Sequence, residues 1–427
     1  MRGKFIEAAA GGMQVMPVLI EPIGENVLPE VGDRKRTRVL VCVGHYLPGY
    51  KSGGPVQSIA NMVTHLSPYY DFYVVTRDRD AGDVESYPGV TSNRWHRIGN
   101  SRVLYCSSVG PSILRRAFLQ VQPDIICLNS FQDAFTQMAV LLRRFGALGK
   151  IPMLLAPRGE FSPGALKIKP VKKLLYRYAT KLLGLHQQLL WLTSSPREKQ
   201  ELLQACPARN LDSNSIYIAC EVGDWTTSMA LHVVKEPGAV KLAFISRISE
   251  MKNLHFLLEV LREICGEVHL DLYGPIADKD ENYWEKCKKL LVQLPANIKV
   301  DYQGSVDHSV VSQLLHDHHF FVLPTKGENF CHAAVESFIN ATPVILSDET
   351  PWTGLNEAHA GFDIPLKDTR GWVAALQKCV DMDQCTYARY LSGALEYGRH
   401  FSVEDAVRQY LAMFEGVLDL RSGGRKR

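Results

Sequence analysis

The sequence lacks the patterns that mark several large classes of protein. No apolar run in its 427 residues reaches the ~18–20 residues that span a bilayer. Glu7 interrupts the N-terminal stretch before the apolar core of a signal peptide can form. The ten cysteines occur singly, with no C-x-x-C pair and no His/Cys cluster at metal-ligand spacing. We therefore expect a soluble, cytosolic protein with reduced, mostly buried thiols and no metal site.

The chain also lacks a strong excess of charge and the best-known nucleotide-binding fingerprints. A formal net charge of +3 is small for this length and argues against a nucleic-acid-binding protein. Its glycine-rich segment, YKSGGPVQSI at 50–59, contains neither G-x-G-x-x-G nor the GK[ST] of a P-loop. Neither half has G-x-G-x-x-G followed by an acidic residue at the expected distance, which argues against a nicotinamide-dependent oxidoreductase.

What is present is the composition and alternation of a two-domain α/β protein. Hydrophobic residues make up 46% and charged residues 22%, which is typical of globular proteins. Short apolar runs rich in β-branched residues alternate with segments of helical periodicity, the pattern of buried parallel strands with crossover helices. The predicted strands of the first series are 37–46, 71–76, 124–129, 151–157 and 190–194. A second series restarts near residue 240, with predicted strands at 240–246, 269–274, 298–304, 320–325 and 343–348.

These two series predict two doubly wound, Rossmann-like units in tandem. The join is expected in DWTTSMALHVVKEPGAV, where strand and helix patterns both fade. Near the C-terminus Ser402 precedes a helical apolar face and has Asp405 three residues on, so it is a candidate N-cap. The expected parts are a flexible leader (1–36), an N-terminal domain (37–232), a C-terminal domain (233–400), and a terminal helix with a basic tail (401–427) that packs back on the N-terminal domain.

In open α/β sheets ligands bind beyond the carboxyl ends of the strands, so the loops after strands are the candidate sites. FISRISEMKNL places Arg247 at a strand end and Lys252 near the start of the next helix. Two cations and free helix amides suit one anion such as a diphosphate. Ordinary surface cations are the alternative. The next loop, YGP with Gly274 and Pro275, suits a turn as well as a ligand.

KGENFCHAAVE places two carboxylates near a third strand end. Glu328 lies on the connection after the strand, and Glu336 lies eight positions on, in the helix that follows. A carboxylate at this edge of a sheet accepts hydrogen bonds from sugar hydroxyls or stabilises a developing oxocarbenium ion. A carboxylate two turns deeper would meet another part of the same ligand, such as a ribose diol. A solvated helix face is the alternative for such a pair.

The first unit offers two further loops and a basic helix. Gly53 and Gly54 allow close approach of the backbone to a ligand, although a plain turn has the same composition. Arg158 follows a predicted strand in APRGEFSPGAL. Downstream, KIKPVKKLLYRYATK holds six Lys or Arg beside apolar residues at helical spacing. This basic amphipathic helix suits anionic lipid headgroups or a phosphate-bearing acceptor, and a solvated face is the alternative.

Taken together, these segments resemble the retaining glycosyltransferases of family 4, also called group 1, which have the GT-B fold. The resemblance runs from about residue 37 to 420. The segments that carry it, in the family's order, are KSGGP, PRGEFSPGALK, FISRISEMKNLHFLLEVL, LYGPIADKDENYWEKC, YQGSV, LPTKGENFCHAAVES and ATPVILSDETPW. A GT-B fold consists of two Rossmann-like domains that face each other across a cleft.

The resemblance assigns roles to the candidate residues. It implies that Glu328 contacts the donor sugar and Glu336 the ribose, as the E-x7-E pair of the family. Arg247 and Lys252 would neutralise the diphosphate, and Arg158 is a candidate for contact with the reacting sugar. The remaining donor-binding candidates are Gly53, Gly54, Gly274, Pro275, Asn329, Phe330 and Cys331. No metal or other cofactor is implied, because the nucleotide diphosphate sugar is a substrate.

The implied reaction is transfer of a sugar to a hydroxyl of a growing surface polysaccharide or a lipid-linked oligosaccharide, at the cytoplasmic face of a bacterial membrane. We expect peripheral contact with an anionic membrane and no binding of nucleic acid. Cys331 and Ala341 stand where the family usually has glycine, and a Cβ at 331 is expected to narrow the donor pocket. Two alternatives remain open: a nucleotide-sugar 2-epimerase and a non-catalytic protein that binds sugar nucleotides or glycans.

Overall fold

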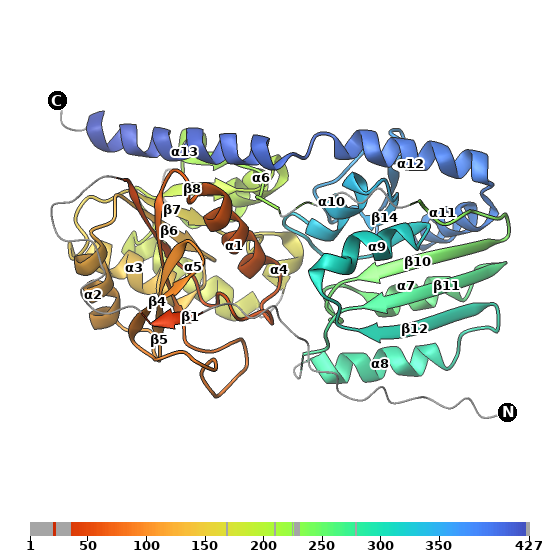
Figure 1. The fold of residues 1–427 in the computed structure, drawn as a ribbon, viewed down its shortest axis with the longest axis horizontal. Coiled ribbons are helices and arrows are strands. Elements are labelled where there is room, and N and C mark those ends of the chain that lie inside the picture. The colour runs from red at the N-terminus through yellow and green to blue at the C-terminus, as the bar shows by residue number, and fades with distance from the viewer. Residues whose placement is uncertain are drawn as a thin grey trace.

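The computed structural model describes residues 20–22, 36–167, 170–208, 211–223, 225, 231–277 and 280–423. Two α/β units lie side by side along the long axis of the molecule, and the last helix extends along the N-terminal unit (Figure 1). Each unit is built on a mainly parallel sheet, as the alternation of strand and helix patterns predicts. Among the described helices, none combines the length and apolar character needed to cross a bilayer.

Within the described residues, the N-terminal sheet has nine strands in the order β1-β4-β5-β3-β2-β6-β7-β8-β9. Neighbours from β5 to β9 pair in parallel, and β4 pairs antiparallel with both β1 and β5. The strands are β1 (Ile20–Pro22), β2 (Arg38–Cys42), β3 (Asp71–Arg77), β4 (Arg94–Ile98), β5 (Ser101–Cys106), β6 (Ile125–Asn129), β7 (Met153–Ala156), β8 (Leu190–Thr193) and β9 (Ile216–Ile218). The helices are α1 (Gly54–Leu66), α2 (Pro111–Val121), α3 (Ala134–Arg144), α4 (Pro163–Lys167), α5 (Pro170–Leu183) and α6 (Pro196–Ala205).

In the part of the chain that the structure describes, the C-terminal sheet has six strands, all parallel, in the order β12-β11-β10-β13-β14-β15. The strands are β10 (Ala239–Ile245), β11 (Glu267–Tyr273), β12 (Ile298–Gly304), β13 (Phe320–Leu323), β14 (Val344–Ser347) and β15 (Gly361–Ile364). The helices are α7 (Leu254–Leu261), α8 (Glu281–Leu291), α9 (Val311–His316), α10 (His332–Ile339), α11 (Thr369–Asp381) and α12 (Gln384–Gly398). Central strands such as β13 and β14 are buried along their whole length, which explains their unbroken apolar sequences.

The last helix, α13 (Val403–Gly423), returns to the N-terminal unit. Its Tyr410 and Phe414 are fully buried in the same apolar core as residues of β2 and α1. Ser402 accepts a hydrogen bond from the backbone amide of Asp405 at 3.0 Å, so it caps the helix. The chain therefore crosses between the units a second time, just before residue 403.

The structure bears on two further expectations, the leader at residues 1–36 and the burial of the cysteines. The leader predicted for residues 1–36 lies mostly outside the described residues, but Ile20–Pro22 within it are an edge strand paired with β4 and not a flexible segment. The strand pattern there is too short to recognise in the sequence. Six of the ten cysteines are buried, and only Cys265 and Cys385 are exposed.

Candidate functional site

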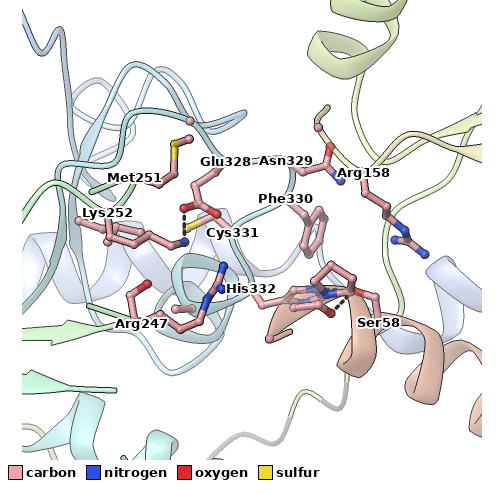
Figure 2. Close-up of a pocket in the computed structure, with 18 of the residues that line it drawn as sticks. Ser58, Arg158, Arg247, Met251, Lys252, Glu328, Asn329, Phe330, Cys331 and His332 are labelled. Carbon is pink, nitrogen blue, oxygen red and sulfur yellow. Dashed lines mark hydrogen bonds and ion pairs between the residues drawn. The ribbon is translucent and has the colours of Figure 1, made fainter. Parts of the chain in front are cut away.

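A cavity of about 470 Å³ lies where the two units meet. The carboxyl ends of β10 and β13 supply one wall, and the start of α1 with the loop after β7 supplies the other (Figure 2). Most of the predicted site residues line it: Gly53, Gly54, Arg158, Arg247, Lys252, Glu328, Asn329, Phe330 and Cys331. Candidate residues chosen because they follow predicted strands therefore come from both units and lie together around this cavity.

The positive side of the cavity comes from the loop after β10. Arg247 and Lys252 both line the cavity, and Lys252 Nζ forms an ion pair with Glu328. Thr325 Oγ1 donates to the same Glu328 Oε1 at 3.1 Å, which fixes the carboxylate in the loop after β13. Within the described part of the chain, no ion pair engages Arg247. On this side of the cavity Lys252 is therefore paired, whereas Arg247 is available to an anion.

Two helix N-termini face the same space. Helix α1 begins with Gly54 and Pro55, and α10 begins with His332 and Ala333, all of which line the cavity. Amides in the first turn of a helix have no intrahelical acceptor, and the helix dipole makes this end positive. A Cβ at Gly53 would lie 3.5 Å from Arg247 Nε, so the glycine lets α1 approach the arginine of the other unit. The arrangement suits an anionic group between the units.

Arg158 lies in the opposite wall and is already engaged. Its Nη1 pairs with Glu221 Oε1 at 2.6 Å, and its Nη2 donates to Asn129 Oδ1 at 3.0 Å. Figure 2 shows its guanidinium group turned away from Lys252 and Glu328. In this conformation Arg158 lines the cavity. Its guanidinium group links the loop after β7 to Glu221 and Asn129 within the N-terminal unit. Its predicted contact with the reacting sugar stays a prediction.

Three predicted donor-binding residues are not among the residues that line the cavity. Glu336 accepts a hydrogen bond from His308 Nε2 at 2.8 Å, one turn beyond the part of α10 that lines the cavity. Gly274 packs so closely on the loop after β10 that a Cβ would come within 2.0 Å of the Ser246 carbonyl oxygen. Pro275 accepts from the amide of Ile248 at 3.0 Å. The contacts of Gly274 and Pro275 support the loop that carries Arg247, and the predicted contacts of all three residues with a ligand remain predictions.

A polar cluster that the sequence did not reveal joins the two units at this cavity. Glu221, which follows β9, is 4% exposed and accepts a hydrogen bond from the Ser58 hydroxyl. His332 Nε2 lies 2.8 Å from Glu221 Oε2 and 2.9 Å from Ser58 Oγ. Because a carboxylate can only accept a hydrogen bond, His332 Nε2 carries a hydrogen and donates a hydrogen bond to Glu221. We call Ser58, Glu221 and His332 the interdomain cluster.

The electrostatics of the cluster follow from its contacts. Burial alone would raise the pKa of Glu221, but the charge of Arg158 and the hydrogen bond from His332 hold it well below its usual range. Asn329 Nδ2 also donates to Glu221 at 3.3 Å, while its Oδ1 is buried without a hydrogen-bond partner among the described residues. The rule of strand ends could have pointed to Glu221, but no sequence pattern connects Ser58, Glu221 and His332, which come from three distant segments.

One group of side chains has the spacing of a metal site, away from the cavity. Ligand atoms of His269, Asp271 and Asp301 on the neighbouring strands β11 and β12 lie within 4.8 Å of one another. These groups already have partners in the protein, since His269 Nε2 is 2.9 Å from Asp301 and His318 Nε2 is 2.9 Å from Asp271. None of the three lines the cavity.

Comparison with known proteins agrees with this geometry. Residues 233–388 match the family model described as "Glycosyl transferases group 1". Curated protein sequences give no match. Sucrose-phosphate synthase from Thermosynechococcus elongatus superimposes with a TM-score of 0.69 at 15% identity, over 90% of this chain and 100% of that one. Anabaena HepE in complex with UDP and glucose superimposes with a TM-score of 0.64 at 15% identity, over 89% of this chain and 100% of that one. The lipopolysaccharide outer core galactosyltransferase WaaB superimposes with a TM-score of 0.59 at 14% identity, over 89% of this chain and 100% of that one.

At these identities the structural likenesses establish the fold alone, and that fold is GT-B, with two Rossmann-like domains across a cleft. The family match is a likeness in sequence, and it lies within the C-terminal unit. The family match covers less than half of the chain, so it shows that the C-terminal unit is similar to the group 1 glycosyltransferases.

Proposed function

We propose that the protein is a retaining glycosyltransferase that moves a sugar from a nucleotide diphosphate sugar to a hydroxyl group of a glycan or lipid-linked acceptor. The single observation that carries the donor assignment is the convergence of Arg247, Lys252 and two helix N-termini on one cavity between the units. This combination fits a diphosphate better than a neutral ligand. Anabaena HepE, which shares the fold, binds UDP and glucose in its crystal structure, and this supports a sugar nucleotide here.

In this proposal catalysis rests on positioning and on stabilisation of the leaving group. Arg247 and Lys252 would gather the negative charge that develops on the diphosphate as the bond to the sugar breaks. Lys252 has three protons to donate, so it can keep its contact with Glu328 while it binds phosphate. Glu328 would then lie beside the sugar. The departing phosphate would accept the proton of the incoming hydroxyl, which attacks on the same face of the sugar. This path gives retention and needs no metal ion.

The acceptor side of the proposal is a surface polysaccharide or a lipid-linked oligosaccharide at the cytoplasmic face of a membrane. WaaB, a galactosyltransferase of the lipopolysaccharide outer core, supports this choice by fold. The N-terminal wall of the cavity, with Ser162 and Ala165 from the segment around α4, is the side from which the acceptor would enter.

The test is turnover of the donor by single variants. The substitutions Arg247→Ala, Lys252→Ala and Glu328→Gln are each expected to lower kcat by about 10²–10³-fold, the usual effect of losing one stabilising group. The exposed Lys289→Ala on α8 is the control and should keep the wild-type rate. A panel of nucleotide sugars is first ranked by thermal shift, because a bound donor stabilises the fold. Near-normal rates in all three site variants would remove the proposed site.

The products decide the rest. NMR of the product formed from an α-linked donor should show an α-linkage, and a β-linkage would contradict retention. Isomerisation of the donor without any acceptor would identify an epimerase instead. Binding of nucleotide with no transfer to any acceptor in the panel would identify a binding protein.

A further inference from the structure

Helix α5 packs on the N-terminal unit by its polar side. Lys173 Nζ donates to the Ala165 carbonyl at 2.6 Å, and the Tyr176 hydroxyl donates to the Phe131 carbonyl at 3.3 Å. Arg177 Nη2 donates to the Ala205 carbonyl, and Thr180 is the buried residue of the helix. These four positions are three and four residues apart and form one face. A helix on the surface of a globular protein normally turns its apolar face inward, so α5 is inverted.

The opposite face of α5 is apolar and exposed to solvent. Its large apolar side chains are 56–69% exposed. They are Val171, Leu174, Leu175, Tyr178, Leu182 and Leu183. Single exposed apolar residues are common on proteins, but a contiguous stripe on one helix marks an interaction surface. We call these six residues the α5 stripe.

Positive charge lies beside the α5 stripe. Residues 167–183, which include α5, contain six Lys or Arg and no acidic residue, although the whole chain has a net charge of only +3. Lys172 and Lys181 are exposed on the helix itself. Arg144 at the end of α3 donates to the Leu183 carbonyl at 3.4 Å, and the next residue, Phe145, is exposed. An apolar stripe bordered by cations matches a surface that is anionic outside and apolar beneath.

We propose that the α5 stripe docks the protein on an anionic lipid bilayer, with its apolar side chains below the headgroups and Lys172 and Lys181 on the lipid phosphates. A second copy of the chain fits less well. A twofold contact would place the same cationic border of one copy against that of the other, and like charges repel. The cations therefore favour the bilayer as the occupant.

The docking surface lies close to the cavity. Lys173 of α5 binds the Ala165 carbonyl of α4, and Ala165 lines the cavity. A membrane under α5 would thus bring lipid-linked acceptors to the N-terminal wall. This consequence rests on the proposed function, whereas binding to the bilayer itself does not.

The experiment is co-sedimentation of the full chain with vesicles, without any sugar nucleotide. Vesicles of phosphatidylcholine with ~30% phosphatidylglycerol are compared with pure phosphatidylcholine, at low and high salt. Leu174→Glu on α5 is paired with Leu119→Glu on α2, because both leucines are 63% exposed in the same unit. The double variant Lys172→Glu/Lys181→Glu is paired with Lys286→Glu/Lys289→Glu on α8, which changes the net charge equally.

The wild type is expected to bind the anionic vesicles, and high salt should weaken binding. Leu174→Glu and the α5 charge reversal should each reduce partitioning by ~10-fold or more, while both controls should bind as the wild type does. Failure to bind, equal binding to neutral vesicles, or equal effects of the α5 variants and their controls would overturn the proposal. So would a dimer, seen by sedimentation velocity, that Leu174→Glu dissociates in a protein that ignores vesicles.

The thermal shift of Leu174→Glu with UDP separates this inference from the proposed function. An unchanged shift together with lost vesicle binding shows that α5 serves the membrane alone, as proposed. An equal loss of the UDP shift and of vesicle binding would show a damaged N-terminal unit and would contradict the specific role of the α5 stripe.

Discussion

At the scale of single residues, Cys331 and Ala341 adopt a backbone conformation that suits glycine. Their φ angles are +65° and +55°, in the left-handed region where a Cβ is unfavourable. Ala341 follows α10, where its amide binds the Phe338 carbonyl and the amide of Thr342 binds the Ser337 carbonyl at 2.8 Å. This is the bond pattern of a Schellman motif, whose left-handed position is usually glycine. The resemblance to a family with glycine at both positions thus has a physical reason.

We predict that Ala341→Gly stabilises the protein. Relief of the left-handed strain outweighs the extra freedom that glycine has in the unfolded chain, for a net gain of about 0.5–1 kcal/mol. The same substitution at Ala374, an exposed position inside α11, should instead destabilise by about 1 kcal/mol. Urea unfolding of the two variants measures both values. Equal destabilisation by the two substitutions would contradict the strain at Ala341.

At the scale of an element, the start of α6 carries a buried carboxylate. Ser195 caps the helix by accepting from the amide of Glu198 at 3.2 Å. Glu198 in turn accepts from the amides of Ser194 and Gly159, both at 2.7 Å, and so ties α6 to the loop that holds Arg158. Burial raises the pKa of Glu198 to about 7, although these hydrogen bonds oppose the shift. The carboxyl group therefore keeps its proton in the folded protein at pH values where the unfolded chain has lost it.

This shift predicts a fall in stability as pH rises from about 4.5 to 7. In that window the folded state binds more protons than the unfolded state, so the free energy of unfolding decreases with pH, by about 3 kcal/mol in all from this group. Glu198→Gln mimics the protonated form and should flatten this part of the profile, while Glu259→Gln, an exposed change on α7, should leave it as in the wild type. Unfolding in urea at a series of pH values tests this. Parallel profiles for wild type and Glu198→Gln would refute it.

Glu221 acts in the opposite window. Its lowered pKa means that it stabilises the fold above the unfolded value, about 4.3, and that this stabilisation is lost as pH falls further. The two buried glutamates therefore place their joint optimum near the lower end of the Glu198 window.

At the scale of the whole molecule, direct contacts hold the two units in a closed arrangement. Arg197 of α6 pairs with Glu349 Oε2 at 2.8 Å and donates to the Thr350 carbonyl at 2.8 Å, across the junction. His332 reaches Glu221 within the interdomain cluster. Both links bridge segments that only the closed form brings together, so each favours closure over an open cleft.

We predict that Arg197→Ala opens the free protein and weakens binding of UDP by roughly 5- to 10-fold. The pair is about one third exposed, so its loss counts for less than a buried ion pair, and the apparent affinity falls with the closed fraction. Small-angle scattering should show a larger radius of gyration, and calorimetry gives the affinity. Glu201→Gln is the control, because it removes only the pairing within α6. A variant as compact and as tight-binding as the control would exclude a role for Arg197 in closure.

The site illustrates how far the sequence reaches. Arg247, Lys252 and Glu328 were predicted because each follows a buried strand, and the structure gathers them at one sheet edge. Glu336 and Gly274 follow the same rule but do not line this cavity, because spacing along a helix or turn does not say which side faces it, and their contacts with a ligand stay predictions. Short edge strands such as β1 and β9 went unrecognised because three residues carry too little pattern.

The sequence is enough to predict the two-sheet α/β fold, because the alternation of buried strands and amphipathic helices is local and recurs along the chain. It also determined which loops carry charge at the strand ends. Three features become visible in the folded chain alone: which charges meet across the cleft, that Arg158 is held by Glu221, and that α5 turns its apolar side to the solvent. Those outcomes depend on packing between segments that are distant in sequence, and no periodicity within a segment encodes them.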